Sequence, residues 1–342
     1  MVTIRAPREV ALVECDERPP GAGEVLVRTL YSGVSAGTEL TAYRGTNPYV
    51  HKQWDRAARL FADGEPTHPY PLDAWGYEQV GRVEALGEGV NGFAGGEPVW
   101  GVWGHRSAAV LPESWLTGRV LPAGVPPLHG VFARIGAVAL NAVLDADIHV
   151  GETVAVFGQG VPGVLATQLA RLNGGTVVAV DRLPRRLELA RSVGAELVVD
   201  ASAGPAAETI REITDGRGAD VVIDLTGSAA ALHEAIRSAA YAARVVVAGF
   251  VQGDATGLRL GEEFHHNRIE LVSSQIANVS PRLAQRWTPL RLERTIVDLH
   301  AAGRLELASL VSHVIPVAQV AEAFRLLDER PGEAVQVVLD FT

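Results

Sequence analysis

The stretch TVAVFGQGVPG, residues 153–163, joins a short apolar run to a glycine-rich turn. The apolar run predicts a buried strand, and GQGVPG after it fits the dinucleotide fingerprint, in which a tight turn leads into a helix. Gly158 permits the turn, Gly160 lets the backbone approach a pyrophosphate, and Gly163 lets the helix pack closely on the strand. Unpaired N–H groups at the start of that helix would face the phosphates. The predicted cofactor turn comprises Gly158, Gln159, Gly160, Val161, Pro162 and Gly163.

The next apolar run ends on an acidic residue that supports this interpretation over a merely glycine-rich turn. VVAVD ends at Asp181, 18 residues after the last glycine of the turn, where a carboxylate can accept both hydroxyl groups of the adenosine ribose. A carboxylate repels a 2′-phosphate, so Asp181 favours NAD. Arg182 follows directly and is a further predicted cofactor contact, and guanidinium groups here could hold a 2′-phosphate, so NADP stays open. We interpret Arg185 and Arg186 as a solvated helix face that pairs with Glu188.

The segments around the turn alternate between apolar runs and amphipathic helices. From about residue 150, runs such as TVVAVD, ELVVD, DVVIDLTG and RVVVAGF are separated by helical segments such as VLATQLARLNG and RRLELARSVG. Strands that are apolar on both sides are typical of a parallel sheet covered by helices on both faces. We therefore expect an α/β fold with a Rossmann doubly wound parallel sheet. Its strand ends would hold the nicotinamide ring near Thr226, Gly249 and Phe250.

The chain on either side of this region has a different pattern of residues. Short β-type runs broken by Gly and Pro, including EVLVRTL, QVGRVEALG and SAAVLP, occupy the first 120 residues. A tail of helix, strand, helix and strand follows residue 280. These parts predict a β-rich second domain with irregular loops.

Composition limits the partners of the chain. Its 342 residues, 47% of them hydrophobic, suffice for one large or two ordinary domains. A net charge of −10 offers no basic surface for nucleic acid or anionic membranes. We find no signal peptide and no apolar run of the roughly 18 residues that a membrane span needs, so we expect a cytoplasmic protein with a small-molecule substrate. The single cysteine, Cys15, excludes a disulfide within the chain and any cysteine-rich zinc cluster.

Over nearly its whole length the chain resembles the medium-chain dehydrogenase/reductases of the zinc-containing alcohol dehydrogenase superfamily. The resemblance is carried by GEVLVRTLYSGVSAGTEL, WGYEQVGRVEALGEGV, GQGVPGVLATQLARL and AFRLLDERPGEAVQVVLDF. It implies a GroES-like catalytic domain from residues 1–125 and 285–342 and a Rossmann dinucleotide-binding domain from residues 126–284. It also implies an active site in the cleft between the domains, and a homodimer or homotetramer.

The zinc ligands of that family are missing from this sequence. The family's first ligand, a cysteine, aligns with Ala36, or with Ser35 if a gap is allowed. Its second, a histidine, aligns with Tyr77, and its third falls near Ala133. Methyl and hydroxyl groups are not ligands for Zn²⁺ in proteins. We therefore expect an enzyme without zinc or any other metal site, with NAD as the preferred cofactor and NADP as a possibility.

Without zinc, another group must move a proton while hydride is transferred. A neutral phenol can donate to a developing alkoxide, so Tyr77 is the predicted acid/base, although it could equally fill the space of the metal. Glu78 matches a glutamate that the family keeps beside the metal, and could instead form a structural salt bridge. Thr38 matches the hydroxyl of the family's proton relay, or simply caps a turn; the relay histidine is replaced by Thr41. His105 is a reserve acid/base.

An insert at residues 46–74 is a candidate lid or substrate wall, or else surface decoration. Its segment HKQWDRAARLF has the spacing of one amphipathic helix with Trp54, Ala57, Ala58 and Phe61 on a common side. Within and around this insert and the predicted cleft, the expected substrate contacts are Ser35, Tyr43, His51 and Trp103.

The function predicted from these features is oxidoreduction. We expect a zinc-independent, NAD(P)-dependent enzyme that interconverts a secondary alcohol and a ketone, with a sugar or cyclitol as the favoured substrate. Two alternatives stay open: a quinone or enoyl reductase of the same superfamily, and a protein that binds NAD as a sensor without turnover.

Overall fold

The computed structural model describes residues 1–251 and 253–342 and divides the chain into two compact units. Unit 1 joins Met1–Arg134 to Leu310–Thr342, and unit 2 comprises Ile135–Ser309. The sequence predicts domain boundaries at 125/126 and 284/285, whereas the compact units divide at 134/135 and 309/310. The second boundary differs most because α9 (Pro289–Ala301) packs on α3 (Phe132–Ala146) within unit 2. A Cβ on Gly136 of α3 would lie 2.6 Å from the Ile296 side chain of α9.

Unit 2 is built on a six-stranded sheet in which every pairing is parallel. From edge to edge the strands are β12 (Leu197–Asp200), β11 (Thr176–Asp181), β10 (Thr153–Phe157), β13 (Ala219–Asp224), β14 (Ala239–Val247) and β15 (Glu270–Ser273). This is the Rossmann order, with the direction of winding reversed between β10 and β13. The fold class expected from alternating apolar runs and helices is confirmed.

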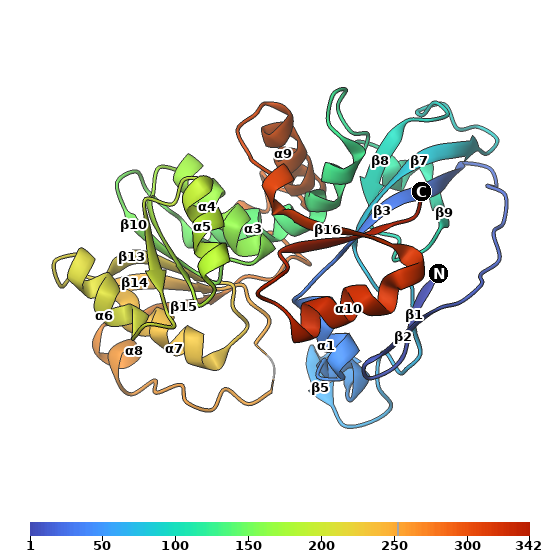
Figure 1. Cartoon of the computed structure of the whole chain (residues 1–342). Helices are drawn as coiled ribbons and strands as arrows, with labels where there is room; N and C mark the ends of the chain where they lie inside the picture. The colour runs from blue at the N-terminus through green and yellow to red at the C-terminus, as the bar shows by residue number, and fades with distance from the viewer. Residues whose placement is uncertain (252) are drawn as a thin grey trace. The chain divides into compact units, whose positions relative to one another are not determined.

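Helices cover both faces of this sheet (Figure 1). One face carries α4 (Val161–Leu172) and α5 (Pro184–Ser192), and the other carries α6 (Ala206–Ile213) and α7 (Ala229–Ser238). The short helix α8 (Glu263–His266) contacts α7. The central strands are fully buried as a result, which is why their sequences are continuously apolar rather than alternating.

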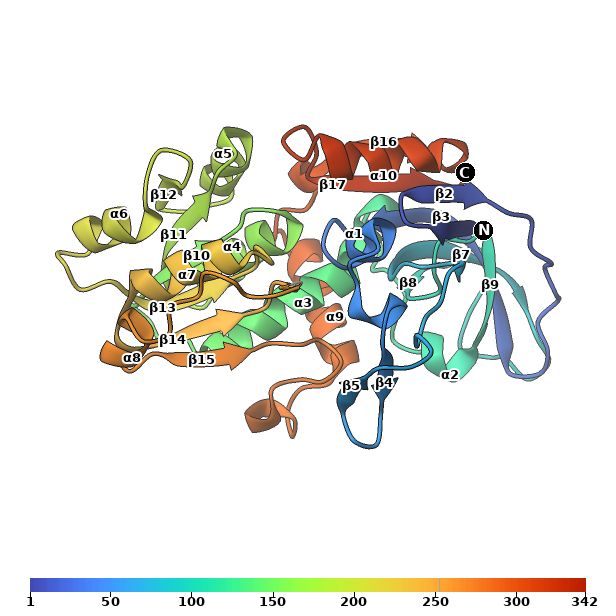
Figure 2. The same ribbon diagram turned by 90° about the horizontal axis from the view of Figure 1, so that it is seen from below.

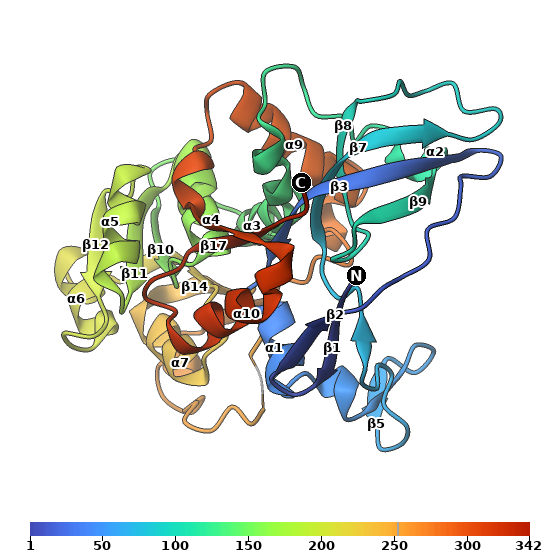
Figure 3. The same ribbon diagram turned by 45° about the vertical axis from the view of Figure 1, so that its right-hand side comes forward.

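Unit 1 is β-rich and is completed by strands from distant parts of the chain. Its largest sheet pairs β17 (Gln336–Asp340) in antiparallel fashion with β3 (Glu24–Val34), which in turn pairs with β7 (Glu78–Leu86), as Figure 3 shows. The rest of this sheet consists of β16 (Val311–Pro316), β8 (Pro98–Gly101) and β9 (Ala108–Pro112). A smaller sheet contains β1 (Val2–Ala6), β2 (Glu9–Leu12) and β6 (Leu72–Asp73).

Two helices fill the space beside these sheets in unit 1. Figure 2 shows α10 (Val320–Glu329) running alongside β16 and β17, and it also contacts α1 (Thr38–Arg44). The contact buries Phe324 of α10 against Tyr43 of α1, with ring centroids 5.3 Å apart. A short helix, α2 (Glu113–Leu116), lies next to β9.

The insert does not form the helix predicted for HKQWDRAARLF. It forms a hairpin of β4 (Gln53–Asp55) and β5 (Leu60–Ala62), in which Trp54 and Phe61 are opposite each other with ring centroids 4.8 Å apart. Asp55 turns the chain by accepting hydrogen bonds from the backbone N–H groups of Ala57 and Ala58. Residues seven apart share a helix face and can also pair across a hairpin, so the apolar spacing alone did not distinguish the two structures.

One helical stretch is long and apolar enough to be a candidate membrane span, although no such run was expected from the sequence. Residues 127–146 include α3 and are 20 residues long with a mean hydropathy of 1.4 in the most apolar window, so by length and composition they could cross a membrane. Two-thirds of that window is buried within the protein (67%), as is typical of a core helix. Its Asn141 side chain donates a hydrogen bond to Ser274 at 3.1 Å.

Asp224 places a buried carboxyl group at the end of β13. Its Oδ1 accepts hydrogen bonds from the Thr226 hydroxyl at 2.7 Å and the Thr226 N–H at 3.1 Å, whereas Oδ2 has no partner. Burial raises the pKa of Asp224 from 3.8 to about 6, and the two bonds from Thr226 oppose this shift. The folded state therefore favours the protonated form.

This shift predicts a pH dependence of stability. Because the folded pKa lies above the unfolded value, the native state holds an extra proton between about pH 4 and 6, and that stabilisation is lost as the pH rises through about 6. The effect is at most about 3 kcal/mol, from 1.36 kcal/mol per pKa unit. Asp224→Asn removes the titrating group. The Tm of the variant minus the Tm of wild type, both measured by calorimetry, should therefore be larger at pH 8 than at pH 4.5. Exposed Asp298→Asn is the control, and an equal Tm difference at both pH values would refute the assignment.

Candidate functional site

The register of β3 and β7 brings the predicted catalytic tyrosine beside a serine in unit 1. Gly33 pairs with Glu78 at the ends of these antiparallel strands, so Ser35 and Tyr77, just beyond the paired residues, face each other. The Ser35 Oγ and Tyr77 Oη lie 2.6 Å apart, and either hydroxyl can be the donor. A predicted substrate contact and the predicted acid/base thus form one hydroxyl pair.

The surroundings of Tyr77 keep its phenol neutral. Burial is the largest cause of a raised pKa of Tyr77, followed by the Glu78 carboxylate and, more weakly, the Glu39 carboxylate. Hydrogen bonds with the side chains of Ser35 and Thr38 oppose the shift. A phenol with a raised pKa is a hydrogen-bond donor and a proton donor at neutral pH, and it is not a general base there.

Glu78 is a buried carboxyl group without a hydrogen-bond partner. It is 1% exposed, and neither carboxylate oxygen accepts a hydrogen bond. Burial and the nearby Glu39 carboxylate raise the pKa of Glu78 well above its usual value, with a smaller opposing effect from the Gln336 amide. That amide donates to the carbonyl groups of Val34 and Val337. Gly33 makes room for the carboxyl, because a Cβ there would lie 2.3 Å from Glu78 Oε2. No ion pair of Glu78 is found, so the salt bridge considered for it is absent from the described residues.

His105 takes part in a fully buried hydrogen-bond network in unit 1. Its Nδ1 lies 2.6 Å from Ser32 Oγ and its Nε2 lies 2.7 Å from Glu39 Oε2. Ser32 Oγ also accepts a hydrogen bond from Gln79 Nε2 at 2.9 Å, so Ser32 connects Gln79 to His105. His105 Nε2 is hydrogen-bonded to Glu39, whose other oxygen accepts the Ser35 N–H at 3.1 Å.

This network gives His105 a structural role that the sequence did not indicate. Both ring nitrogens are hydrogen-bonded and the side chain is 0% exposed, so His105 positions Ser32 and Glu39, and its role as a reserve acid/base stays a prediction. The network fixes Glu39, which holds the Ser35 backbone next to Tyr77. Sequence reasoning missed Glu39, which was read only as part of a motif. The sequence shows His105 and Glu39 separately, but it does not show that the fold brings these distant residues into hydrogen-bond contact.

The other predicted residues of unit 1 are distributed differently from the expectation. Thr38 begins α1, and its side chain is close enough to Tyr77 to oppose the rise in the pKa of the phenol. Tyr43 is part of the core between α1 and α10, so packing replaces the predicted substrate contact. Trp103 is also core: it is 7% exposed and its indole N–H donates to Thr29. His51 is exposed and bonds to the Gly45 carbonyl.

In unit 2 the glycine-rich turn has the geometry that the fingerprint requires. Gly158 has φ +85°, a conformation that favours glycine, and Gly160 precedes the first turn of α4. A Cβ on Gly163 would lie 1.7 Å from the Gly158 carbonyl oxygen, so only glycine fits there. The side chain of Gln159 is buried and bonds to the Val156 carbonyl at 2.9 Å, which leaves its role structural. Val161 and Pro162 form the first positions of the helix.

Asp181 lies at the end of β11 beside this turn. Its carboxylate accepts the backbone N–H groups of Gln159 at 2.6 Å, Arg182 at 2.7 Å and Leu183 at 2.9 Å. An ionised carboxylate has about four acceptor positions, so one is left for a ribose hydroxyl. The side chain of Arg182 is exposed. Arg186 does not belong to the predicted solvated face: its guanidinium lies 4.0 Å from Asp181, because α5 presents it to the end of β11.

The predicted nicotinamide loops meet at the ends of β13 and β14. A Cβ on Gly249 would lie 2.4 Å from the Gly227 nitrogen, so the two loops approach backbone to backbone. Thr226 lies next to the glycine-rich turn, since a Cβ on Gly158 would be 3.0 Å from its methyl group. Phe250 is 39% exposed. Unit 2 thus gathers the predicted pyrophosphate, ribose and nicotinamide contacts at the carboxyl ends of its strands, where ligands bind in this fold.

The positions of the family's zinc ligands do not fit a zinc ion. Ala36 presents an exposed methyl group, Ala133 a buried one, and Tyr77 a phenol that is bonded to Ser35. Within the part of the chain that the structure describes, three ligand atoms from His, Cys, Asp or Glu come within 4.8 Å of one another only in unit 2, at His233, Glu262 and Glu263.

The chain is similar to known dehydrogenases in sequence and in fold. Residues 162–289 match the family model of the zinc-binding dehydrogenases. D-Guloside 3-dehydrogenase of Escherichia coli K12 is 28% identical over 344 residues, which cover 98% of each chain. Sorbitol dehydrogenase of Halalkalibacterium halodurans is 25% identical over 365 residues, which cover 96% of this chain and 95% of the relative.

A solved structure of the same fold contains a nicotinamide cofactor. It is that of short chain alcohol dehydrogenase (rspB) from Escherichia coli CFT073, complexed with NADH. It superposes with a TM-score of 0.77 at 22% identity and covers 99% of this chain and 98% of the other. The matches show that residues 162–289 resemble the zinc-binding dehydrogenases, and that the chain is similar over nearly its whole length to enzymes named as dehydrogenases of CH–OH groups.

Proposed function

We propose that the chain is a zinc-independent, NAD-dependent dehydrogenase that interconverts a secondary alcohol of a sugar, glycoside or cyclitol with the ketone. The observation that carries the proposal is the Ser35–Tyr77 hydroxyl pair, whose members the family resemblance aligns with positions of zinc ligands. The pair offers a proton donor in place of a Lewis acid.

The acid role follows from the electrostatics of unit 1. A bound nicotinamide supplies hydride transfer. The Tyr77 phenol, whose pKa is raised, is the proton donor to the substrate oxygen in ketone reduction, and Ser35 orients the phenol. Glu78, whose pKa is also raised, is a buried carboxyl close enough to Tyr77 to affect its charge and is the candidate reservoir for that proton. Glu39 and His105 hold this arrangement.

The preference for NAD rests on Asp181. Its carboxylate is fixed by three backbone N–H groups and has room for one more donor, which suits a ribose hydroxyl and disfavours a 2′-phosphate. The NADH complex of a structural relative supports a nicotinamide cofactor. The nearby Arg186 keeps some tolerance for NADP, because it places a positive charge 4.0 Å from Asp181.

The substrate class is supported by the relatives. D-Guloside 3-dehydrogenase and sorbitol dehydrogenase both act on polyhydroxylated molecules by name, and both align over nearly the full chain. A hydroxyl pair such as Ser35 and Tyr77 can bond to a substrate rich in hydroxyl groups, which agrees with that class.

Tyr77→Phe tests the acid role, because it removes the hydroxyl and keeps the ring. We expect kcat to fall by about 10²-fold or more, the range of general acid catalysis, with the Kd for NADH unchanged by fluorescence titration. Tyr43→Phe is the matched control: it alters a core tyrosine of the same unit and should change kcat less than about threefold. A Tyr77→Phe enzyme with wild-type kcat would show that the ring acts only by filling space.

Asp181→Ser tests the ribose contact. Loss of a charged hydrogen-bond acceptor should raise KM for NAD by about 10- to 100-fold and narrow the preference for NAD over NADP. Asp200→Ser is the control, since Asp200 ends the neighbouring strand in register with Asp181 but bonds to Ser202. If both variants keep the wild-type KM and cofactor preference, Asp181 does not bind the ribose.

The absence of a zinc requirement is tested by activity after removal of metal. Nicotinamide absorbance is followed on chelator-treated protein with NAD or NADP and a panel of D-gulosides, other glycosides, polyols, cyclitols and simple secondary alcohols. We expect turnover to survive the chelator and to be fastest with a polyhydroxylated substrate. Turnover lost to the chelator and restored by zinc would overturn the metal-free mechanism. Tight NAD binding without turnover on any member of the panel would favour the sensor alternative.

A further inference from the structure

Unit 2 brings one histidine and two glutamates together between α7 and α8, away from the residues assigned to the cofactor. Ligand atoms of His233, Glu262 and Glu263 lie within 4.8 Å of one another. We propose that these three side chains form a binding site for a divalent transition-metal ion of the zinc class. The sequence alone predicts no metal site, and this one is independent of the proposed catalytic mechanism.

The state of His233 is the first support for this site. Its side chain belongs to α7 and is only 7% exposed, yet neither Nδ1 nor Nε2 has a hydrogen-bond partner. Buried polar groups are nearly always bonded, so an imidazole with two unsatisfied nitrogens requires an explanation. A metal ion would bond to one of these nitrogens and so supply a partner that the protein itself does not.

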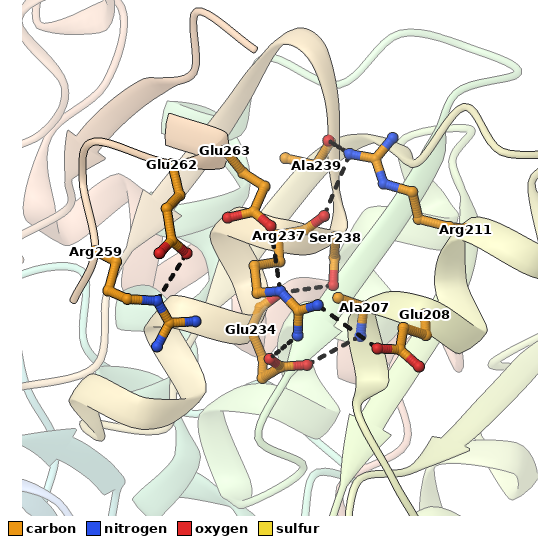
Figure 4. Close-up of polar contacts among 10 residues, drawn as sticks. All are labelled: Ala207, Glu208, Arg211, Glu234, Arg237, Ser238, Ala239, Arg259, Glu262 and Glu263. Atoms are coloured by element: carbon orange, nitrogen blue, oxygen red, sulfur yellow. Dashed lines mark hydrogen bonds and ion pairs between the residues drawn. The ribbon is translucent and has the colours of Figure 1, made fainter. Parts of the chain in front are cut away.

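The two glutamates are arranged as ligands that are already oriented. Oε1 of Glu263 accepts a hydrogen bond from Arg237 Nε at 3.4 Å, and Oε2 is buried without a partner. Oε2 of Glu262 accepts a hydrogen bond from Arg259 Nε at 2.7 Å, which leaves Oε1 of this exposed side chain available to a metal ion. Figure 4 shows both pairs, each with one carboxylate oxygen directed at a guanidinium group. Metal-binding carboxylates are commonly held in this way by a neighbouring donor.

The charge of the surroundings is compatible with a cation. Arg237 also pairs with Glu234 at 2.6 Å and with Glu208 at 3.7 Å, so its charge is shared among three carboxylates. The ion pairs join the carboxylates of Glu208, Glu234 and Glu263 to Arg237 and that of Glu262 to Arg259, so carboxylates outnumber guanidinium groups around the site (Figure 4). Ion pairs with arginine alone would explain the glutamates but would leave the nitrogens of His233 unsatisfied.

The ligand types and spacing favour zinc over magnesium or calcium. Imidazole nitrogen with carboxylate oxygen suits Zn²⁺ and its neighbours, whereas Mg²⁺ and Ca²⁺ prefer oxygen ligands throughout. With bonds of about 2.1 Å, ligand atoms in a tetrahedron lie roughly 3.4 Å apart. The ligand atoms now lie within 4.8 Å of one another, so the distances between them must shorten by about 1.4 Å at most. Rotation of the exposed Glu262 side chain can bring its carboxylate closer to the other two ligands. Water would complete the coordination. Bound metal would fasten α8 and Glu262 to α7.

The test is zinc binding to the full-length, chelator-treated protein, measured by calorimetric titration. We expect about one strong Zn²⁺ site per chain, lost or weakened at least tenfold in His233→Ala and in Glu263→Gln. His265→Ala is the matched control, because it removes an exposed histidine of α8 and should bind zinc like wild type. His233→Phe keeps the volume of the ring, so it should fold and still lose the site.

A second readout separates this site from catalysis. Zinc should raise the Tm of wild type and of His265→Ala, and should leave the Tm of His233→Phe unchanged. Absence of strong zinc binding in wild type, or equal binding in wild type and His233→Phe, would overturn the proposal. Neither result depends on turnover, so failure of the metal site and failure of the proposed dehydrogenase activity are distinguishable.

Discussion

The buried pair of Glu39 and His105 is the interaction on which the arrangement around Ser35 and Tyr77 in unit 1 depends. Both side chains are 0% exposed, and the 2.7 Å bond between them links α1 to the segment after β8. Removing one partner of a buried ion pair or charged hydrogen bond costs about 3–5 kcal/mol, because the other is left unsatisfied. Glu39 in turn bonds to the Ser35 N–H, so the Ser35–Tyr77 hydroxyl pair is held by a network that never needs to contact substrate.

Two carboxyl groups are buried beside the predicted reactive positions without full hydrogen bonding. Glu78 in unit 1 and Asp224 in unit 2 each have an unpartnered oxygen, and burial raises the pKa of both. Such groups reduce the stability of a fold, so their occurrence at the ends of β7 and β13 is better explained by chemistry than by packing. Glu78 also contributes to the raised pKa of Tyr77, which makes the phenol a proton donor.

The sequence predicted features that depend on local backbone geometry. The turn from Gly158 to Gly163 was predictable because a close approach of helix and strand admits only glycine, and the parallel sheet because its strands are apolar on both sides. Features that depend on distant partners were not predictable. His105 has its role because of Glu39, and Arg186 because α5 presents it to Asp181. The β4–β5 hairpin was mistaken for a helix since one apolar spacing fits both.

The position of β17 has a consequence for how the protein is made. This strand lies between β16 and β3, so the main sheet of unit 1 cannot close until residues near 340 have left the ribosome. Unit 2, in contrast, is encoded by one continuous segment and can fold during synthesis. The half-finished chain would then expose the edge of β3 while translation continues, and unpaired strand edges promote aggregation. Slow translation after residue 309 would prolong this exposure. Unit 1 is therefore the part of the chain that is prone to aggregate during synthesis.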